Sequence, residues 1–141
     1  MKFASILFLF LVVVTVTQAQ TGPCTEGIIR SGGMPVADEA FSYMPAYGRP
    51  VIGHGAMKDA DTKSFSDRTN IQRSWEDDHR VVVNAAGDMG YEYGTLRMSY
   101  DSKSEGHNEF EAVMLLVYKA KGNTCEQVAL TMQPLEPEKK N

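Results

Sequence analysis

Several chemical signatures are missing from this sequence of 141 residues. It contains no Gly-x-Ser-x-Gly nucleophile motif, no glycine-rich phosphate loop and no cysteine or histidine spacing typical of a zinc site. Its three histidines are scattered along the chain, and no internal repeat is present. The sequence therefore predicts no bound metal and no cofactor.

Positive charge is also scarce. The chain carries 14 Lys and Arg against 18 Asp and Glu, for a net charge of −4. The only adjacent basic residues are Lys139–Lys140, next to the C-terminus. A mildly acidic chain without a basic cluster is a poor partner for nucleic acid or an anionic membrane surface, so we expect neither.

Long hydrophobic runs are limited to the N-terminus. Lys2 precedes an apolar stretch, Phe3–Val16, that is too short for a membrane span, and Thr17–Gln18–Ala19 offers small residues at a cleavage site. We interpret residues 1–19 as a signal peptide, with an uncleaved signal anchor as the alternative. The protein is then secreted or periplasmic, and one domain follows.

Cysteine occurs only twice, at Cys24 and Cys125. In an exported protein such a pair favours a disulfide, which would tie the N-terminal segment to the last predicted strand. The alternative is two separate thiols, with Cys125 buried in that strand.

The chain divides into an irregular N-terminal arm (20–34), an α+β domain (35–133) and a flexible tail (134–141) rich in Pro, Glu and Lys. Pro35–Met44 predicts a short helix, because proline suits a first turn and Asp38–Glu39 would lie at the positive end of the helix dipole. A second short helix is predicted from His54 to about Asp61.

The C-terminal half predicts strands. They cover Ile71–Ala86, as one long or two broken strands, then Met89–Tyr100, His107–Lys119 and Thr124–Gln133. Gly87–Asp88 marks a tight turn before the second of these, and short connections make the last three strands sequential antiparallel neighbours. The predicted fold is a curved antiparallel sheet of about four strands packed on short N-terminal helices.

Alternation separates the two faces of these strands. Tyr91, Tyr93 and Arg97 share one face, whereas Glu92, Leu96 and Met98 share the other. We expect the aromatic face to enclose the helices. The strand at His107–Lys119 is apolar on both faces in its C-terminal half, which predicts a central place in the sheet.

Four segments in order resemble the NTF2-like superfamily, and within it the SnoaL-like and DUF4440-type domains. They are Ala37–Phe41, Gly48–Met57, Gly87–Gly94 and the strand pair Val113–Lys119 with Gln127–Met132. The resemblance implies a cone-shaped α+β fold. Only Ser42–Tyr47 separates the first two segments, so the helical region is shortened and the general base of the isomerase branch has no counterpart here.

The leading functional hypothesis is a non-catalytic domain that binds a small, mostly apolar molecule inside the cone. The candidate ligand-binding residues are aromatic, methionine or hydrogen-bonding side chains on the strands: Trp75, Tyr91, Tyr93, Arg97, Phe110 and Met114. Each of them is equally explained by core packing or, for Arg97, by an exposed position at the end of a strand.

A second hypothesis is an enzyme of the isomerase, cyclase or dehydratase type. Asp88 or His54 would serve as the base, and Tyr91 or Tyr93 as hydrogen-bond donor. An aspartate in a Gly-Asp turn is more simply explained by turn geometry.

A third hypothesis is association. The face of Val113, Leu115 and Val117 could form a homodimer interface, alone or together with either of the other functions.

Overall fold

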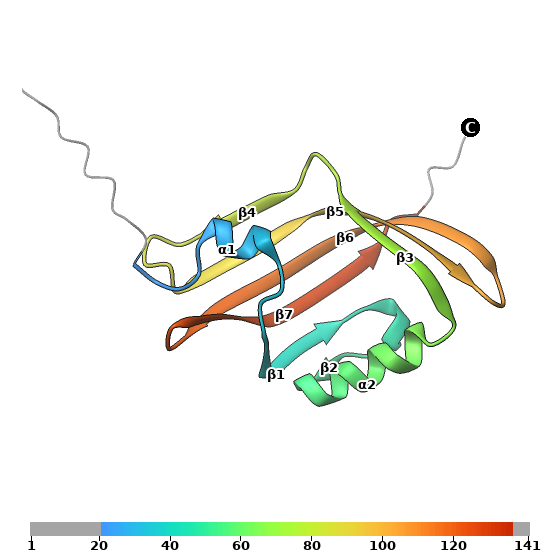
Figure 1. Ribbon diagram of the computed structural model, residues 1–141, viewed down its shortest axis with the longest axis horizontal. Helices are drawn as coiled ribbons and strands as arrows, with labels where there is room; N and C mark the ends of the chain where they lie inside the picture. The colour runs from blue at the N-terminus through green and yellow to red at the C-terminus, as the bar shows by residue number, and fades with distance from the viewer. Residues whose placement is uncertain (1–20, 137–141) are drawn as a thin grey trace, which may run out of the picture.

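The computed structural model describes residues 21–136 (Figure 1). The predicted signal peptide, residues 1–19, lies outside the described residues, as do residues 137–141 of the predicted tail. Within 21–136, no helix has the length and apolar character needed to cross a membrane.

The described chain forms two α-helices, one 3-10 helix and seven strands. In order these are α1 (Glu26–Ser31), β1 (Val36–Tyr43), η1 (Pro45–Tyr47), β2 (Val51–Ile52), α2 (His54–Phe65), β3 (Arg68–Trp75), β4 (Arg80–Val83), β5 (Met89–Ser102), β6 (Gly106–Lys121) and β7 (Thr124–Pro134).

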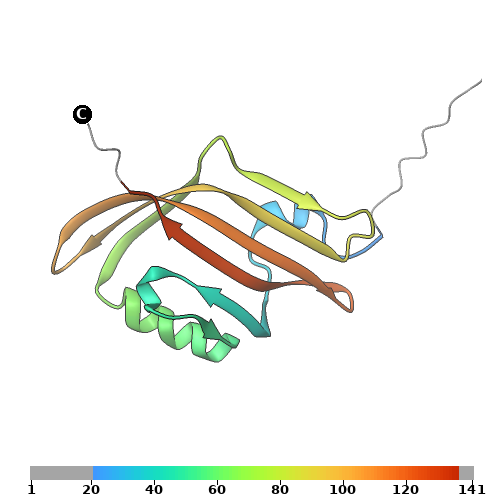
Figure 2. The same cartoon turned by 180° about the vertical axis from the view of Figure 1, so that it is seen from behind.

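All seven strands belong to one bent sheet in the order β2-β1-β7-β6-β5-β3, with β4 also paired to β5 (Figures 1 and 2). Every pairing is antiparallel except that between β1 and β7, which is parallel. The predicted α+β class and central β6 are confirmed. The prediction of about four antiparallel strands is wrong, because the sheet is mixed and has seven.

The predicted helix at Pro35–Met44 is wrong. This segment forms β1, in which Ala40 and Ser42 are buried while Phe41 and Tyr43 are exposed. Such a two-residue period belongs to a strand. One partner, the two-residue β2, is close in sequence, but the longer pairing joins Ser42 to Leu130 of β7, and a local pattern could not reveal it.

The predictions for the other helix and for the strands agree better with the structure. The helix expected from His54 extends to Phe65 as α2, and the two-strand version of Ile71–Ala86 is correct, as β3 and β4. Within the predicted irregular arm, α1 begins where the Thr25 hydroxyl accepts a hydrogen bond from the Ile28 amide at 3.3 Å.

The turn between β4 and β5 also anchors the arm. Gly87 has φ of +68°, as the predicted tight turn requires, and its carbonyl accepts a hydrogen bond from the Cys24 amide at 2.9 Å. A Cβ at Gly22 would lie 2.1 Å from the same carbonyl oxygen, so the two backbones touch. The predicted disulfide between Cys24 and Cys125 is confirmed.

The two faces of β5 are the reverse of our expectation. Glu92, Leu96 and Met98 are buried on the concave face, whereas Tyr91 and Tyr93 are each 41% exposed on the outer face. One reason is Gly94 on the concave side, where a Cβ would lie 2.8 Å from the His79 Cα. The chain that joins β3 to β4 therefore crosses the inner side of β5, and the tyrosines point outward.

The two helices lie at opposite ends of this concave face, α1 beside β4 and α2 beside β1 and β2 (Figure 1). The hydrophobic core has two clusters, one near each helix. One surrounds the disulfide and contains Ile29, Val81, Leu116 and Tyr118; the other is rich in methionine and contains Met44, Leu96, Met98, Ala112 and Met132.

Candidate ligand site on the concave face

Two adjoining hollows occupy the concave face. The first, about 220 Å³, lies at the α2 end, and the second, about 300 Å³, lies at the α1 end. Both are lined by Arg73, Leu96, Met114 and Gln127, so they meet in the middle of the sheet. We call them the α2 hollow and the α1 hollow.

Apolar side chains dominate the α2 hollow, most of them sulfur-containing. They are Met44, Met57, Phe65, Leu96, Met98, Met114, Leu130 and Met132. Methionine is unbranched and polarizable, so it adapts its shape to what lies against it. A concave, mostly apolar surface with a few convergent polar groups is the usual form of a small-molecule site.

The polar groups of the α2 hollow gather around the Tyr47 hydroxyl. This hydroxyl donates a hydrogen bond of 2.5 Å to the Asp61 carboxylate. Burial, reinforced by that hydrogen bond, raises the pKa of Tyr47 well above its usual value, while nearby Ser42 and Arg73 act in the opposite direction. Tyr47 is thus a neutral donor whose proton is committed to Asp61.

Ser42 is the buried polar residue of this hollow. It is fully buried in β1 beside the Tyr47 hydroxyl, whose pKa it lowers, but its own hydroxyl forms no hydrogen bond of good geometry among residues 21–136. Buried hydroxyls are almost always paired, so an unpartnered one at the wall of a hollow is informative.

The α1 hollow contains a buried carboxylate with two donors. Glu92 is 7% exposed, and its two oxygens lie 2.8 Å from His79 Nε2 and 2.8 Å from the Tyr118 hydroxyl. The His79 ring stacks on Trp75 with centroids 4.4 Å apart, and Arg30 of α1 lies 3.5 Å from His79 Nδ1. Both oxygens of the buried Glu92 carboxylate therefore have a polar partner inside the fold.

Alkaline pH should weaken the fold through Tyr47 and Tyr118. Burial and a carboxylate partner raise the pKa of each. Their contribution to stability is therefore complete below the pKa of an unfolded tyrosine, near 10, and declines as the pH rises above it. Absorbance at 295 nm at about pH 11 should show two more ionised tyrosines in urea than in the folded protein. Equal numbers would contradict this environment.

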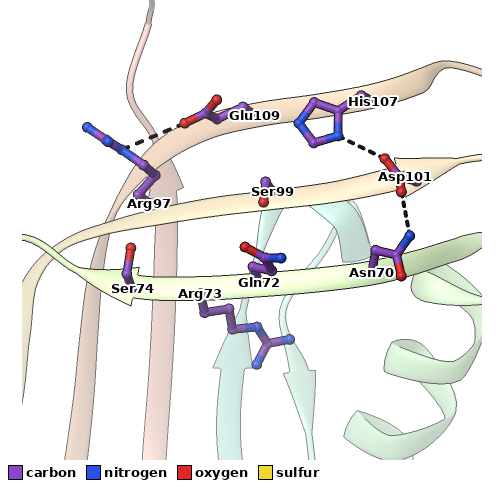
Figure 3. A pocket seen from close by; sticks show the side chains of 9 residues that line it. All are labelled: Asn70, Gln72, Arg73, Ser74, Arg97, Ser99, Asp101, His107 and Glu109. Carbon is purple, nitrogen blue, oxygen red and sulfur yellow. Dashed lines mark hydrogen bonds and ion pairs between the residues drawn. The ribbon is translucent and has the colours of Figure 1, made fainter.

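A third hollow of about 550 Å³ lies on the outer face of β3, β5 and β6 and is polar throughout (Figure 3). Asn70 and His107 both hydrogen-bond Asp101, at 2.6 and 2.8 Å. Both lower the pKa of the Asp101 carboxyl, Asn70 more than His107. Because these groups are exposed and already bonded to one another, this groove is a weaker candidate than the concave face.

The structure separates the predicted site residues. Trp75 lines the α1 hollow, Met114 lines both hollows, and Phe110 packs edge-to-face on Tyr100 in the methionine-rich core cluster without lining either hollow. Placing Tyr91, Tyr93 and Arg97 inside the cone was wrong, since all three lie on the outer face. Arg97 there pairs with Glu76 at 3.2 Å and Glu111 at 3.0 Å.

Neither predicted base lies in a hollow. Asp88 is exposed in the turn, where it accepts a hydrogen bond from the Asn84 side chain, which supports its turn role. His54 is exposed at the first residue of α2. The sequence pattern gives neither residue a partner for acid–base chemistry, and the structure places both outside the two hollows.

Sequence reasoning missed most of the polar groups that line the hollows, among them Ser42, Tyr47, Asp61, Arg73, Glu92 and Tyr118. A signal existed for Glu92, because it shares a strand face with Leu96 and Met98, and a charged residue on an apolar face needs a buried partner. No local pattern marks Ser42 or Arg73.

No protein-family model and no curated protein matches this sequence. Several solved structures share its fold. An NTF2-like superfamily protein from Salmonella enterica superposes with a TM-score of 0.61 at 10% identity, over 77% of this chain and 76% of the other. A putative calcium/calmodulin-dependent protein kinase II association domain from Xanthomonas campestris gives 0.63 at 10% identity, over 73% and 70%.

A ketosteroid isomerase-like protein from Erwinia carotovora atroseptica gives a TM-score of 0.59 at 12% identity, over 72% of this chain and 77% of the other. Identities this low establish the fold and nothing finer. The chain has an NTF2-like α+β fold. The predicted NTF2-like fold is therefore confirmed, and the face of β5 that carries Glu92 is the one that faces its concave interior.

Proposed function

We propose that this protein is an exported, non-catalytic domain that binds a small, mostly apolar molecule in the α2 hollow. On its sequence motifs, we further propose that it is a shortened relative of the SnoaL-like and DUF4440-type domains. The observation that carries the binding proposal is the hollow of about 220 Å³ lined by methionines beneath α2.

Two features support binding over purely structural packing. A core that only stabilises the fold is filled by its own side chains, whereas this one leaves space at its centre. The residues that the sequence offered as bases, Asp88 and His54, line neither hollow. The two carboxylates that do line the hollows, Asp61 and Glu92, each already accept a hydrogen bond from a tyrosine hydroxyl.

The proposal can be tested with the uncharged fluorescent probe N-phenyl-1-naphthylamine. Its fluorescence should rise on binding to the wild-type protein. The variant Met57→Gln should weaken this binding several-fold, because Met57 is buried on α2 and faces the hollow. The matched control is Met89→Gln, since Met89 is the first residue of β5, lies on its outer face and is 48% exposed. Equal losses in the two variants, or no binding at all, would contradict the proposal.

A second proposed property, compatible with the first, is association of two copies through the outer face. Exposed apolar side chains from neighbouring strands gather there: Phe41, Tyr43, Val82, Tyr91, Tyr93, Val113 and Leu115. Contiguous exposed apolar surface of this kind marks interaction sites. Several similar structures are association or hub domains, which also favours an oligomer.

Leu115→Lys should convert a dimer into a monomer. Leu115 of β6 pairs with Tyr93 of β5 and is 37% exposed. A lysine at this position therefore reaches solvent in the monomer, whereas in a two-fold dimer it buries two positive charges in the interface. Light scattering coupled to size-exclusion chromatography measures the mass. Lys121 lies at the far end of β6, so Lys121→Ala should leave the dimer intact. A wild-type protein that remains monomeric at high concentration would exclude the interface.

A further inference from the structure

The α2 hollow is lined by more free hydrogen-bond donors than free hydrogen-bond acceptors. The Tyr47 proton is committed to Asp61, whereas the Ser42 hydroxyl is fully buried and without a partner among the described residues. Arg73, an exposed residue of β3, lines both hollows and also borders the outer polar groove, and it forms no ion pair or side-chain hydrogen bond within residues 21–136. A guanidinium carries five N–H donors and no acceptor.

Arg73 is aimed at the concave side. Figure 3 shows its side chain leaving β3 in the direction opposite to those of Gln72 and Ser74, which face the polar groove. Its charge also acts on the Tyr47 hydroxyl, which places the guanidinium near the polar cluster of the α2 hollow. Arg73 and Ser42 therefore approach one hydroxyl from two different strands, β3 and β1.

We infer that the molecule bound in the α2 hollow carries a carboxylate, held by Arg73 and Ser42, on an apolar body that lies among the methionines. This inference rests on the proposed function and specifies the chemistry of its ligand. A carboxylate accepts hydrogen bonds at both oxygens and matches the planar fork of a guanidinium. The hydroxyl of Ser42 then gains the acceptor that it lacks in the protein alone.

A cationic head group fits less well. Asp61 is the single carboxylate among the described residues that line this hollow, and its Oδ1 already accepts the Tyr47 proton. A cation near Asp61 would also face the charge of Arg73. The same donor set accepts other small anions, and a carboxylate is favoured because both of its oxygens can accept from the planar guanidinium fork.

The test compares octanoate with octanamide, which has the same chain and no charge, by competition against N-phenyl-1-naphthylamine. Wild type should bind octanoate at least about tenfold more tightly than octanamide. Arg73→Gln should remove that preference while keeping the affinity for octanamide and for the probe. Arg49→Gln is the matched control, because Arg49 is exposed and lines neither hollow.

Ser42→Ala separates a binding role from a structural one. It should weaken octanoate binding about three- to tenfold and change the melting temperature little, because the Tyr47 hydroxyl keeps its hydrogen bond to Asp61. Equal affinities for octanoate and octanamide, or an unchanged preference in Arg73→Gln, would overturn the inference while leaving the proposed function intact. Failure of the uncharged probe to bind would reject both.

Discussion

Loss of the Cys24–Cys125 disulfide is expected to lower the free energy of unfolding by about 4 kcal/mol, the largest single effect in this protein. The bridge closes a loop across a sequence separation of 101 residues. Without it the unfolded chain gains the conformational freedom of that loop, and the arm with α1 is held only by the packing of Ile29 and by backbone contacts with Gly87. The double variant Cys24→Ala/Cys125→Ala, unfolded in urea, measures the effect.

Reductant supplies the control for this experiment. It should destabilise the wild-type protein by a similar amount and leave the double variant unchanged. A loss below about 1 kcal/mol would mean that Ile29 and the hydrogen bond from the Cys24 amide to Gly87 hold the arm in place by themselves.

The variant Glu92→Ala is expected to cost about 3 kcal/mol. It removes the acceptor of the buried Tyr118 hydroxyl and of His79 Nε2, and it leaves a cavity beside α1. Glu92→Gln should cost less than half as much, because the amide oxygen still accepts the Tyr118 proton. Thermal and urea unfolding at pH 7 measure both variants.

Glu109→Ala is the matched control, since the Glu109 side chain is 58% exposed on the outer face. It should change stability by no more than about 0.5 kcal/mol. If Glu92→Ala behaved like this control, the network with His79 and Tyr118 would not contribute to the fold as described.

The C-terminal sheet was predictable because its signals are local. Short turns at Gly87–Asp88, 103–105 and Gly122–Asn123 separate four strands, β4 to β7, each of which pairs with the next one in sequence. β1 was not predictable in this way. Asp38 and Glu39 after Pro35 fit a helix N-terminus, but pairing with the short β2 and with the distant β7 makes Val36–Tyr43 a strand.

The orientation of β5 shows why the site was only partly predictable. The tyrosines on one face of β5 favoured that face as the interior. The glycines that make space for α1 and for the β3–β4 connection lie on the opposite face of β5, and that face is the interior. Trp75 and Met114 could be proposed from composition. Ser42 of β1 and Arg73 of β3 line the same hollow although three strands separate β1 from β3 in the sheet, and no spacing in the sequence encodes this.

The most direct test of ligand binding is a methionine-methyl NMR titration with N-phenyl-1-naphthylamine. The aromatic probe shifts methyl signals near it. We predict large shifts for the five methionines that line the α2 hollow, Met44, Met57, Met98, Met114 and Met132, and none for Met89 on the outer face. Shifts at Met89 with the five unmoved would place the ligand on the outer surface and contradict the proposed site.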